Sequence, residues 1–455
     1  MNKKGTYTLF FIILTMVFLF GCDEKPGVDN ETLGEMISID GVDVSGMSIG
    51  DAYESLTYAH EQMLAGTKYV IKTDKAETVE IKASELPFSF NVQKALEEAF
   101  SLEPYQISSG EPRTLRCQIA YNEEEGIKII DSKTKALYRD PVDAKAVYDP
   151  NAAEGFKFVK EQPGLKADIQ DINMQIAQSV IEGNIIEINA KMLEVTPEYT
   201  LERAKMENTL VSEFSTSYAK SPHNNENRVY NIKKGADMID GVRLNPGEEF
   251  DTNDILGPRN EKNGWKEAPG IRNGKYEQEF GGGICQVSST LYNAVLMADL
   301  EITDRQHHSW PMGYVPIGRD ATISTDGPNL KFKNNGDTPI TISAKTDDEN
   351  LTITISIYGT ALKDGMSIKL SSDKIDTLPE PEPEFELDSG LPYNTKVKKR
   401  DGRAGSVSET YKEYYDSNGK LLKRKLVSKD TYKPISAIVQ VSEDIYYQQI
   451  WNNVD

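Results

Sequence analysis

Proline and glutamate alternate over residues 379–384, where single glutamates separate Pro379, Pro381 and Pro383. Proline lacks the backbone N–H that helices and sheets need, and neighbouring like charges repel, so this run favours an extended spacer. A chain of 455 residues is long enough for about three domains. We therefore expect an acidic, proline-rich linker over residues 376–388 and separately folded regions on either side of it.

The charge of the chain argues against a nucleic-acid partner. Its 51 Lys and Arg residues face 72 Asp and Glu residues, a formal net charge of -21, whereas an extended nucleic-acid surface needs a cationic footprint. A hydrophobic content of 38% is sufficient for folded cores. The three cysteines lie far apart without a CxxC pair, so neither a disulfide framework nor a thiolate zinc site is indicated.

The N-terminal segment has the form of a secretion signal. Lys3 and Lys4 precede an apolar run over residues 7–20, which is too short to span a bilayer comfortably. The order Leu, spacer, Gly and Cys over residues 19–22 resembles the lipoprotein box of bacteria, in which the cysteine is lipidated and becomes the new N-terminus.

We therefore expect a lipoprotein signal peptide over residues 1–21, lipidation at Cys22 and a polar tether over residues 22–36. An uncleaved N-terminal anchor is the alternative. In both cases the rest of the protein is extracytoplasmic. In the lipoprotein case it is anchored to the bacterial cell membrane and faces the cell wall.

Strand and helix patterns are mixed in residues 37–200. Short β-prone runs at 69–71 and 79–81 are followed by a helical pattern over 92–102, which is typical of an α+β region. In the tail, residues 406–415 and 420–428 alternate around an Asp-Ser-Asn-Gly turn and predict an antiparallel hairpin in a small all-β module. The fold class expected for the whole chain is multidomain α+β.

A glycine-rich turn leads into a helix at Cys285. Three glycines occupy residues 281–283, and the apolar residues that follow recur at helical spacing, at Val287, Leu291, Ala294, Val295 and Ala298. The free N–H groups and the positive end of a helix stabilise a thiolate, and glycines let the backbone approach a substrate closely. Cys285 is therefore the candidate nucleophile. The alternative is a turn into a core helix with an ordinary buried cysteine.

The same turn predicts the surroundings of the nucleophile. Backbone N–H groups from Gly283 to Gln286 are expected to hold an oxyanion. Ser309 and Trp310 are expected to contribute a substrate-binding wall, with Trp310 or Tyr292 lining the cleft.

A thiolate nucleophile needs a base within hydrogen-bond reach. Of the four histidines, His307 and His308 follow a strand-like path over residues 301–305 that leads back from the predicted helix. Adjacent residues on a strand point to opposite faces, so only one of the pair can face Cys285. We choose His308 as the base, because the residues that follow it are suited to form a shaped wall.

The base needs an orienting acceptor, for which Asp320 is the first choice and Asn334 the second. The alternative for Asp320 is a partner in its own turn, such as Arg319. A metal site at His307 and His308 is disfavoured, since neighbouring strand side chains diverge and no ligand spacing is completed. We expect neither a metal nor a cofactor.

Three stretches of this region together resemble a VanW domain. They are Leu-Asn-Pro-Gly-Glu-Glu-Phe at 244–250, Gly-Gly-Gly-Ile-Cys-Gln-Val-Ser-Ser-Thr-Leu-Tyr at 281–292, and the segment from His-Ser-Trp-Pro to Gly-Arg-Asp-Ala at 308–321. The resemblance covers about residues 208–345, and we expect the domain itself to extend over residues 208–360. The family is named from glycopeptide-resistance clusters and includes members described as cysteine L,D-transpeptidases of peptidoglycan. The resemblance implies that Cys285 is the nucleophile.

Two weaker resemblances flank this domain. Residues 37–200, with Gly-Val-Asp-Val-Ser-Gly at 41–46 and Pro-Gly-Leu at 163–165, resemble the peptidoglycan-binding domain that often precedes VanW domains. Residues 389–445 resemble a single G5 domain, a module common on cell-wall proteins and thought to bind amino-sugar glycans. The alternative for residues 37–200 is a spacer without a ligand, and the alternative for residues 389–445 is a rigid extension that binds nothing.

These features predict a protein that modifies peptidoglycan. Cys285 would attack the carbonyl that follows the third residue of a stem peptide, release the terminal D-amino acid and pass the acyl group to an amine of a neighbouring stem. The expected partners are stem peptides, glycans through the G5 domain, and the membrane through the lipid. Hydrolysis by the same thiol, as a peptidase, and a non-catalytic scaffolding lipoprotein are the alternatives.

Overall fold

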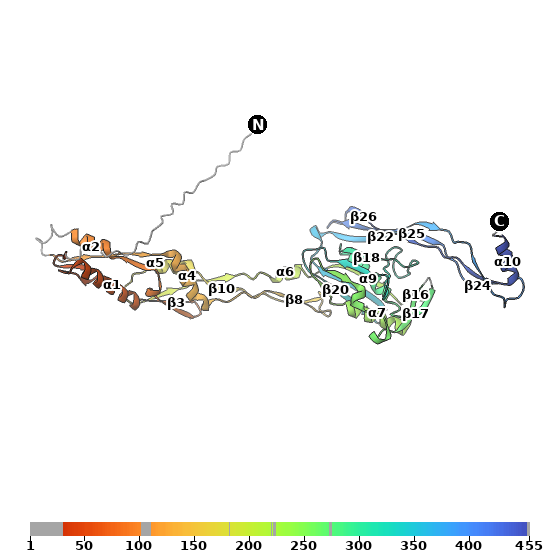
Figure 1. Cartoon of the computed structure of the whole chain (residues 1–455), viewed down its shortest axis with the longest axis horizontal. Helices are drawn as coiled ribbons and strands as arrows, with labels where there is room; N and C mark the ends of the chain where they lie inside the picture. Colours follow the sequence, from red (N-terminus) through yellow and green to blue (C-terminus); the bar gives the residue numbers. More distant parts are fainter. Residues whose placement is uncertain are drawn as a thin grey trace, which may run out of the picture. The chain divides into compact units, whose positions relative to one another are not determined.

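The computed structural model describes most of the chain (Figure 1). The expected signal peptide over residues 1–21 and the expected lipidation site Cys22 lie outside the described residues, as does most of the expected tether. Among the described residues, no helix combines the length and apolar character needed to span a membrane. The described residues are 31–101, 111–181, 183–219, 221, 224–272 and 275–452.

The chain separates into two units, of which unit one comprises the described residues up to Val142 together with Pro163–Thr196. It mixes helices with small sheets in the strand orders β2-β1-β6, β11-β3-β4, β10-β12 and β5-β7. Its strands are β1 (Ile37–Ile39), β2 (Val42–Asp43), β3 (Lys68–Lys72), β4 (Thr78–Lys82), β5 (Phe88–Asn91), β6 (Arg113–Leu115), β7 (Gln118–Tyr121), β10 (Gly164–Ala167), β11 (Ile185–Asn189) and β12 (Met192–Val195). Its helices are α1 (Ile49–Gly66), η1 (Ala83–Glu85), α2 (Val92–Ser101), α4 (Glu123–Thr134), η2 (Lys135–Leu137) and α5 (Ile169–Ala177).

Unit two comprises Asp143–Gln162 and the chain from Pro197 onward. Its helices are α6 (Leu201–Met206), α7 (Glu226–Ile239), α8 (Thr252–Leu256), η3 (Glu261–Asn263), α9 (Ile284–Met297), η4 (Lys363–Gly365) and α10 (Glu443–Asn452). Its strands up to η4 are β8 (Lys145–Tyr148), β9 (Phe156–Val159), β13 (Thr209–Ser217), β14 (Arg243–Leu244), β15 (Glu249–Asp251), β16 (Glu267–Arg272), β17 (Lys275–Phe280), β18 (Glu301–Arg305), β19 (Leu330–Lys333), β20 (Ile340–Asp347) and β21 (Thr352–Gly359). The strands that follow are β22 (Ser367–Leu378), β23 (Glu384–Leu387), β24 (Lys396–Arg400), β25 (Gly405–Tyr415), β26 (Leu421–Tyr432) and β27 (Ile438–Val441).

The hairpin β8–β9 belongs to unit two, although its sequence lies within the predicted N-terminal region of residues 37–200. Tyr148 on β8 donates its hydroxyl proton to Asp240 Oδ1 at 2.6 Å and lies 2.8 Å from Ser343 Oγ on β20. These partners are 92 and 195 residues away in sequence. No local pattern could have indicated the contact.

Helix α9 lies against the antiparallel sheet β13-β21-β20-β14. Alternating isoleucines of β21 and the apolar side of α9 share one core, and every residue from Gln286 to Leu296 is buried. A helix that is buried on all sides must satisfy its polar groups within the protein. The polar residues of α9 therefore bond to neighbouring segments, which positions the candidate site described below.

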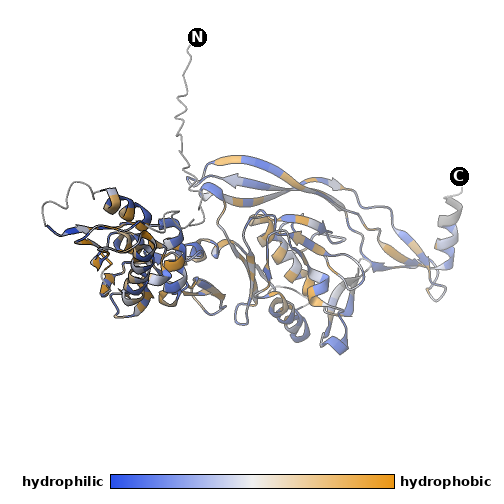
Figure 2. Ribbon diagram, turned by 60° about the vertical axis from the view of Figure 1, so that its left-hand side comes forward, coloured by the Kyte–Doolittle hydropathy of each residue, from blue (hydrophilic) through white to orange (hydrophobic). Residues whose placement is uncertain are grey.

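The predicted hairpin in the tail is confirmed, since β25 pairs antiparallel with β26. In addition, β22 pairs with β25 from Ser367 opposite Tyr415 to Leu378 opposite Gly405. The strand before the proline-glutamate run thus pairs with a strand after it, and residues 379–383 of the run itself have no regular secondary structure. Figure 2 shows short apolar and polar bands alternating along these long strands. The chain also carries α10 after the last strand, which the sequence pattern did not indicate.

Candidate active site

Cys285 lies in the first turn of α9, as predicted. The N-cap residue Gly283 has φ 107° and Gly281 has φ 82°, values that side chains rarely adopt. A Cβ on Gly283 would lie 2.8 Å from Arg228 Cγ, and one on Gly281 would lie 2.7 Å from Arg259 Cγ. Both positions therefore require glycine, and the tight turn leaves the thiol partly exposed at the end of the helix.

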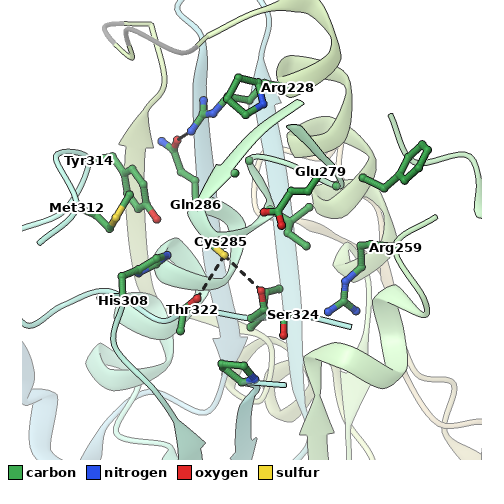
Figure 3. Close-up of a pocket in the computed structure, with 18 of the residues that line it drawn as sticks. Arg228, Arg259, Glu279, Cys285, Gln286, His308, Met312, Tyr314, Thr322 and Ser324 are labelled. Atoms are coloured by element: carbon green, nitrogen blue, oxygen red, sulfur yellow. Dashed lines mark hydrogen bonds between the residues drawn. The ribbon is translucent and has the colours of Figure 1, made fainter. Parts of the chain in front are cut away.

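The Cys285 thiol faces a cavity of about 1050 Å³ (Figure 3). Its Sγ lies 3.5 Å from the carbonyl oxygen of Ile323, to which the S–H can donate, and 3.8 Å from Thr322 Oγ1. A cavity of this size is in the range that accommodates a ligand of several residues. The alternative of a cysteine sealed in the core is therefore excluded.

His308 lines the same cavity as Cys285 and is the histidine that lowers the pKa of the Cys285 thiol. Its Nδ1 lies 2.6 Å from Asp320 Oδ2, and its backbone N–H donates to the same oxygen at 2.6 Å. His307 also borders the cavity, but its Nδ1 contacts the His308 carbonyl oxygen and its ring packs against Tyr432. The structure therefore brings together the three residues that the sequence analysis selected as nucleophile, base and orienting acceptor.

The other candidate acceptors have different partners. Asn334 donates to the carbonyl oxygens of Leu244 and Thr338 and so closes a turn. Arg319 donates its Nε proton to Asn293 Oδ1 at 2.6 Å and does not pair with the neighbouring aspartate.

Helix α9 itself holds the segment that carries Asp320. Ser288 donates to the Ala321 carbonyl oxygen at 2.7 Å, and Ser289 Oγ accepts from the Ala321 N–H at 2.9 Å. One turn further, Asn293 donates to the Arg319 carbonyl oxygen at 2.8 Å. The helix that presents the thiol thus also fixes the distance to the orienting carboxylate.

The charges of the three groups are strongly coupled. Burial disfavours the Asp320 carboxylate, but hydrogen bonds from His308 and Tyr432 lower its pKa to about 2. Burial also disfavours the His308 imidazolium, yet Asp320 and Cys285 raise its pKa to about 9. Burial opposes the Cys285 thiolate, and His308, the Ile323 backbone and Thr322 outweigh it and lower the pKa of the thiol. The imidazolium and the thiolate thus stabilise each other, so the thiolate is more populated at Cys285 than in a free cysteine.

The predicted oxyanion donors need a correction. The Gln286 N–H donates to the Gly283 carbonyl oxygen at 3.0 Å, and the Gln286 side chain bonds to Arg228 and Thr216. In the described part of the chain, the N–H groups of Gly283 and Cys285 have no acceptor. These two groups, rather than Gln286, are the available donors at the helix end.

The predicted wall is also different. Ser309 lines the cavity, but Trp310 and Tyr292 do not. Both aromatic rings are buried elsewhere, Tyr292 next to Arg305 and Trp310 beneath Arg403. The sequence analysis missed Met312 and Tyr314, which border the cavity in their place (Figure 3). Their only signal was their position just after the predicted base.

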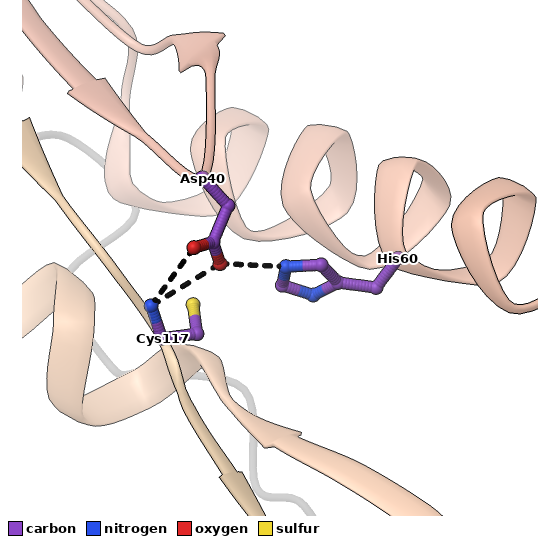
Figure 4. Close-up of side chains that lie close together, drawn as sticks. All are labelled: Asp40, His60 and Cys117. Carbon is purple, nitrogen blue, oxygen red and sulfur yellow. Dashed lines mark hydrogen bonds and ion pairs between the residues drawn. The ribbon is translucent and has the colours of Figure 1, made fainter. Parts of the chain in front are cut away.

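A second cluster of donors lies in unit one, where Asp40, His60 and Cys117 offer oxygen, nitrogen and sulfur atoms within 4.8 Å of one another (Figure 4). His60 Nε2 lies 2.9 Å from Asp40 Oδ2, to which the Cys117 N–H donates at 3.1 Å. A metal on Nε2 would move the ring proton to Nδ1, which is buried without a partner among the described residues. The cluster is therefore best described as a buried hydrogen-bonded group. The remaining histidine, His223, lies outside the described residues.

Fold and site together define an α+β domain with a cysteine, a histidine and an aspartate assembled at a helix N-terminus. Residues 227–356 match the family described as VanW like protein, so this part of the chain is similar to that family. It is 44% identical over 131 residues to the uncharacterized protein YoaR of Bacillus subtilis (strain 168), covering 29% of this chain and 43% of that protein. It is 32% identical over 131 residues to the vancomycin B-type resistance protein VanW of Enterococcus faecalis (strain ATCC 700802 / V583), covering 28% and 48% respectively. The chain thus spans less than half the length of either relative.

Two solved structures also show similarity to part of the chain. The IgA1 protease G5 domain is 20% identical with a TM-score of 0.14 and covers 18% of this chain and 94% of its own. HP0197-G5 is 21% identical with a TM-score of 0.12 and covers 16% and 95%. Scores this low do not assign the fold of the tail, and the G5 domain over residues 389–445 stays a prediction.

Proposed function

We propose that this protein is associated with the cell wall and that its VanW domain is a cysteine L,D-transpeptidase acting on peptidoglycan stem peptides. The observation that carries the proposal is the grouping of Cys285 and His308 in the lining of one open cavity, with His308 hydrogen-bonded to Asp320 and lowering the pKa of the Cys285 thiol. A thiolate with an adjacent imidazolium, itself oriented by a carboxylate, is the arrangement that acyl transfer through a thioester requires.

In the first step, the Cys285 thiolate attacks the carbonyl carbon that follows the third residue of a stem peptide. The N–H groups of Gly283 and Cys285 hold the negative oxygen of the tetrahedral intermediate. The C–N bond then breaks, His308 gives its proton to the leaving amine, and the terminal D-amino acid departs. The stem remains attached to Cys285 as a thioester.

In the second step, an amine of a neighbouring stem attacks the thioester. Neutral His308 takes a proton from this amine, Cys285 leaves as the thiolate, and a new peptide bond links the two stems. Asp320 keeps the imidazole in the required tautomer through both steps, since it accepts from Nδ1 and leaves Nε2 toward the thiol. Water in place of the amine would give hydrolysis at the same site.

The flanking regions extend the proposal. Lipidation at Cys22 would hold the protein at the outer face of the cell membrane, and residues 37–200 and 389–445 would contact the wall. Their contacts with the wall are proposed from resemblance alone, and the catalytic proposal does not depend on those contacts.

The test is incubation of the full-length protein, purified in detergent, with muropeptides that carry tetrapeptide stems, followed by mass analysis of the products. We expect crosslinked dimers and released D-amino acid from the wild type, and neither from Cys285→Ser or His308→Ala. Cys117→Ala is the matched control and should retain activity. Shortened stems without dimers would show that the enzyme hydrolyses the acyl intermediate and does not transfer it to an amine. Equal dimer formation by the wild type and by Cys285→Ser would exclude the thiol mechanism and leave scaffolding as the role of the protein.

A further inference from the structure

Arg259 lies in the same cavity as the nucleophile, across the turn that precedes α9. Its side chain is 8% exposed and packs against Gly281, where an added Cβ would lie 2.7 Å from Arg259 Cγ. In Figure 3 it lies on the opposite side of Cys285 from His308. The guanidinium is therefore held by the tight turn that also presents the thiol.

The guanidinium has hydrogen-bond acceptors but lacks a paired carboxylate. Nη1 donates to the Gly257 carbonyl oxygen at 2.8 Å and Nη2 to Asn253 Oδ1 at 2.6 Å, and both acceptors are neutral. Nε has no partner. A guanidinium offers five N–H donors, so several remain unused. Within the described ranges, no carboxylate lies at ion-pair distance from Arg259.

A buried cation without a counter-charge is costly, and the neighbours of Arg259 do not remove this cost. The charges of Cys285, Asp326 and Glu279 favour the guanidinium, yet burial dominates and lowers the pKa of Arg259. The strongest of these charges, the Cys285 thiolate, already has the His308 imidazolium as its partner. An anion supplied by the ligand would complete the site.

We propose that Arg259 binds the free C-terminal carboxylate of the stem peptide, so that the site selects acyl donors with an unblocked terminal residue. This inference rests on the proposed function. The terminal carboxylate follows the scissile carbonyl by one residue, a step of about 3.8 Å along the chain. Arg259 and Cys285 line the same cavity, and the charge of Cys285 acts on the guanidinium more strongly than that of any carboxylate, so the two groups are near neighbours as such a short separation requires. The planar fork of arginine also matches the two oxygens of a carboxylate.

The test compares two acyl donors, a tetrapeptide-stem muropeptide and the same molecule with its terminal carboxylate converted to an amide. The rate of acylation of Cys285, as kcat/KM, is measured by release of the terminal residue or its amide. We expect the wild type to favour the acid by roughly 10- to 100-fold, the range for loss of charge-assisted hydrogen bonds. In Arg259→Gln this preference should fall to near unity while the rate with the amide stays close to that of the wild type.

Lys262→Gln is the matched control, because it removes the same charge three residues away, on the exposed helix η3 and outside the cavity. It should keep the full preference. Arg259→Lys should retain part of the preference and serves if the glutamine variant fails to fold. A wild type that accepts acid and amide equally would overturn the inference. An Arg259→Gln variant that loses both substrates in equal proportion would also overturn it, since the residue would then be structural.

A binding measurement separates this inference from the proposed function. In the Cys285→Ala background, calorimetry with the same two muropeptides should give tighter binding of the acid, and Arg259→Gln should abolish the difference. If the wild type shows no turnover but this binding preference persists, transpeptidation fails and the carboxylate site stands. If turnover is found without any preference, the carboxylate site fails and transpeptidation stands.

Discussion

Each residue of the candidate triad has a protonation state set by its two neighbours. The pKa of His308 is raised to about 9, and the pKa of Cys285 is lowered from that of a free thiol. His308 therefore keeps its proton over a pH range in which Cys285 begins to ionise. Acylation needs the thiolate and the imidazolium at the same time. The pH dependence of the reaction follows from this requirement.

We predict a bell-shaped dependence of acylation kcat/KM on pH. The rate should fall as pH rises through about 9, because His308 then lacks the proton that the leaving amine needs. The acidic limb should lie below the usual range of a thiol, where Cys285 becomes protonated. Initial rates across a pH series check this. A rate that keeps rising above pH 9 would exclude His308 as the proton donor.

The two described cysteines should differ in reactivity. Burial, with a further contribution from Asp40, raises the pKa of Cys117 to about 12, whereas the pKa of Cys285 is lowered and its sulfur reaches the cavity. At pH 7, iodoacetamide should label Cys285 at least tenfold faster than Cys117, because the thiolate is the reactive form and its population changes about tenfold for each unit of pKa. His308→Ala should slow labelling of Cys285, because burial then acts unopposed by the imidazolium. Peptide mass analysis over time measures both rates, and equal rates would contradict thiol activation.

At the scale of elements, strand β26 reaches the orienting carboxylate from the tail of the chain. Tyr432 donates its hydroxyl proton to Asp320 Oδ1 at 2.5 Å and accepts from the Gly318 N–H at 3.0 Å. Asp430 on the same strand binds Arg305 of β18 through both oxygens at 2.7 and 2.8 Å. The tail sheet is therefore a direct support of the site.

We predict that Tyr432→Phe destabilises the protein by about 1–3 kcal/mol, because the Gly318 N–H and an Asp320 oxygen lose a buried partner. Acylation should slow by roughly tenfold, since Asp320 is held less firmly. Tyr411→Phe, which removes a hydroxyl that donates to the Glu409 carboxylate on β25, away from Asp320, is the control and should change both quantities little. Thermal unfolding and initial rates measure them, and equal effects of the two variants would count against a supporting role of Tyr432.

At the scale of the whole molecule, unit two joins segments that are far apart in sequence. Hairpin β8–β9 contacts β20 through Tyr148. Strands β25 and β26 contact the segment around Gly318, where Thr410 Oγ1 of β25 donates to the Gly318 carbonyl oxygen at 2.9 Å and the Tyr432 hydroxyl of β26 accepts from the Gly318 N–H at 3.0 Å. The predicted linker at residues 376–388 therefore does not separate the tail from the VanW domain as independent bodies.

We accordingly predict that removal of residues 379–455 lowers the thermal stability of the VanW domain and abolishes acylation, since β22 loses its partner strand and Asp320 loses Tyr432. A shorter truncation after residue 437 keeps β25 and β26 and should retain measurable activity. Calorimetric unfolding and the muropeptide assay compare the two proteins. Full activity in the protein that lacks residues 379–455 would show that the tail does not support the site.

The sequence by itself determined the features that depend on local pattern. These are the glycine turn into the helix at Cys285, the hairpin around the Asp-Ser-Asn-Gly turn, and the choice of His308 and Asp320 close behind the helix. Local periodicity, turn chemistry and short return paths constrain such features within some 35 residues of chain. Only the tertiary structure decided that Arg259 and Tyr432 border the site, that Trp310 and Tyr292 turn away from it, and that β22 pairs across the proline run. Contacts of this second kind join residues through packing and strand pairing between distant segments, and no pattern within either segment alone specifies its partner.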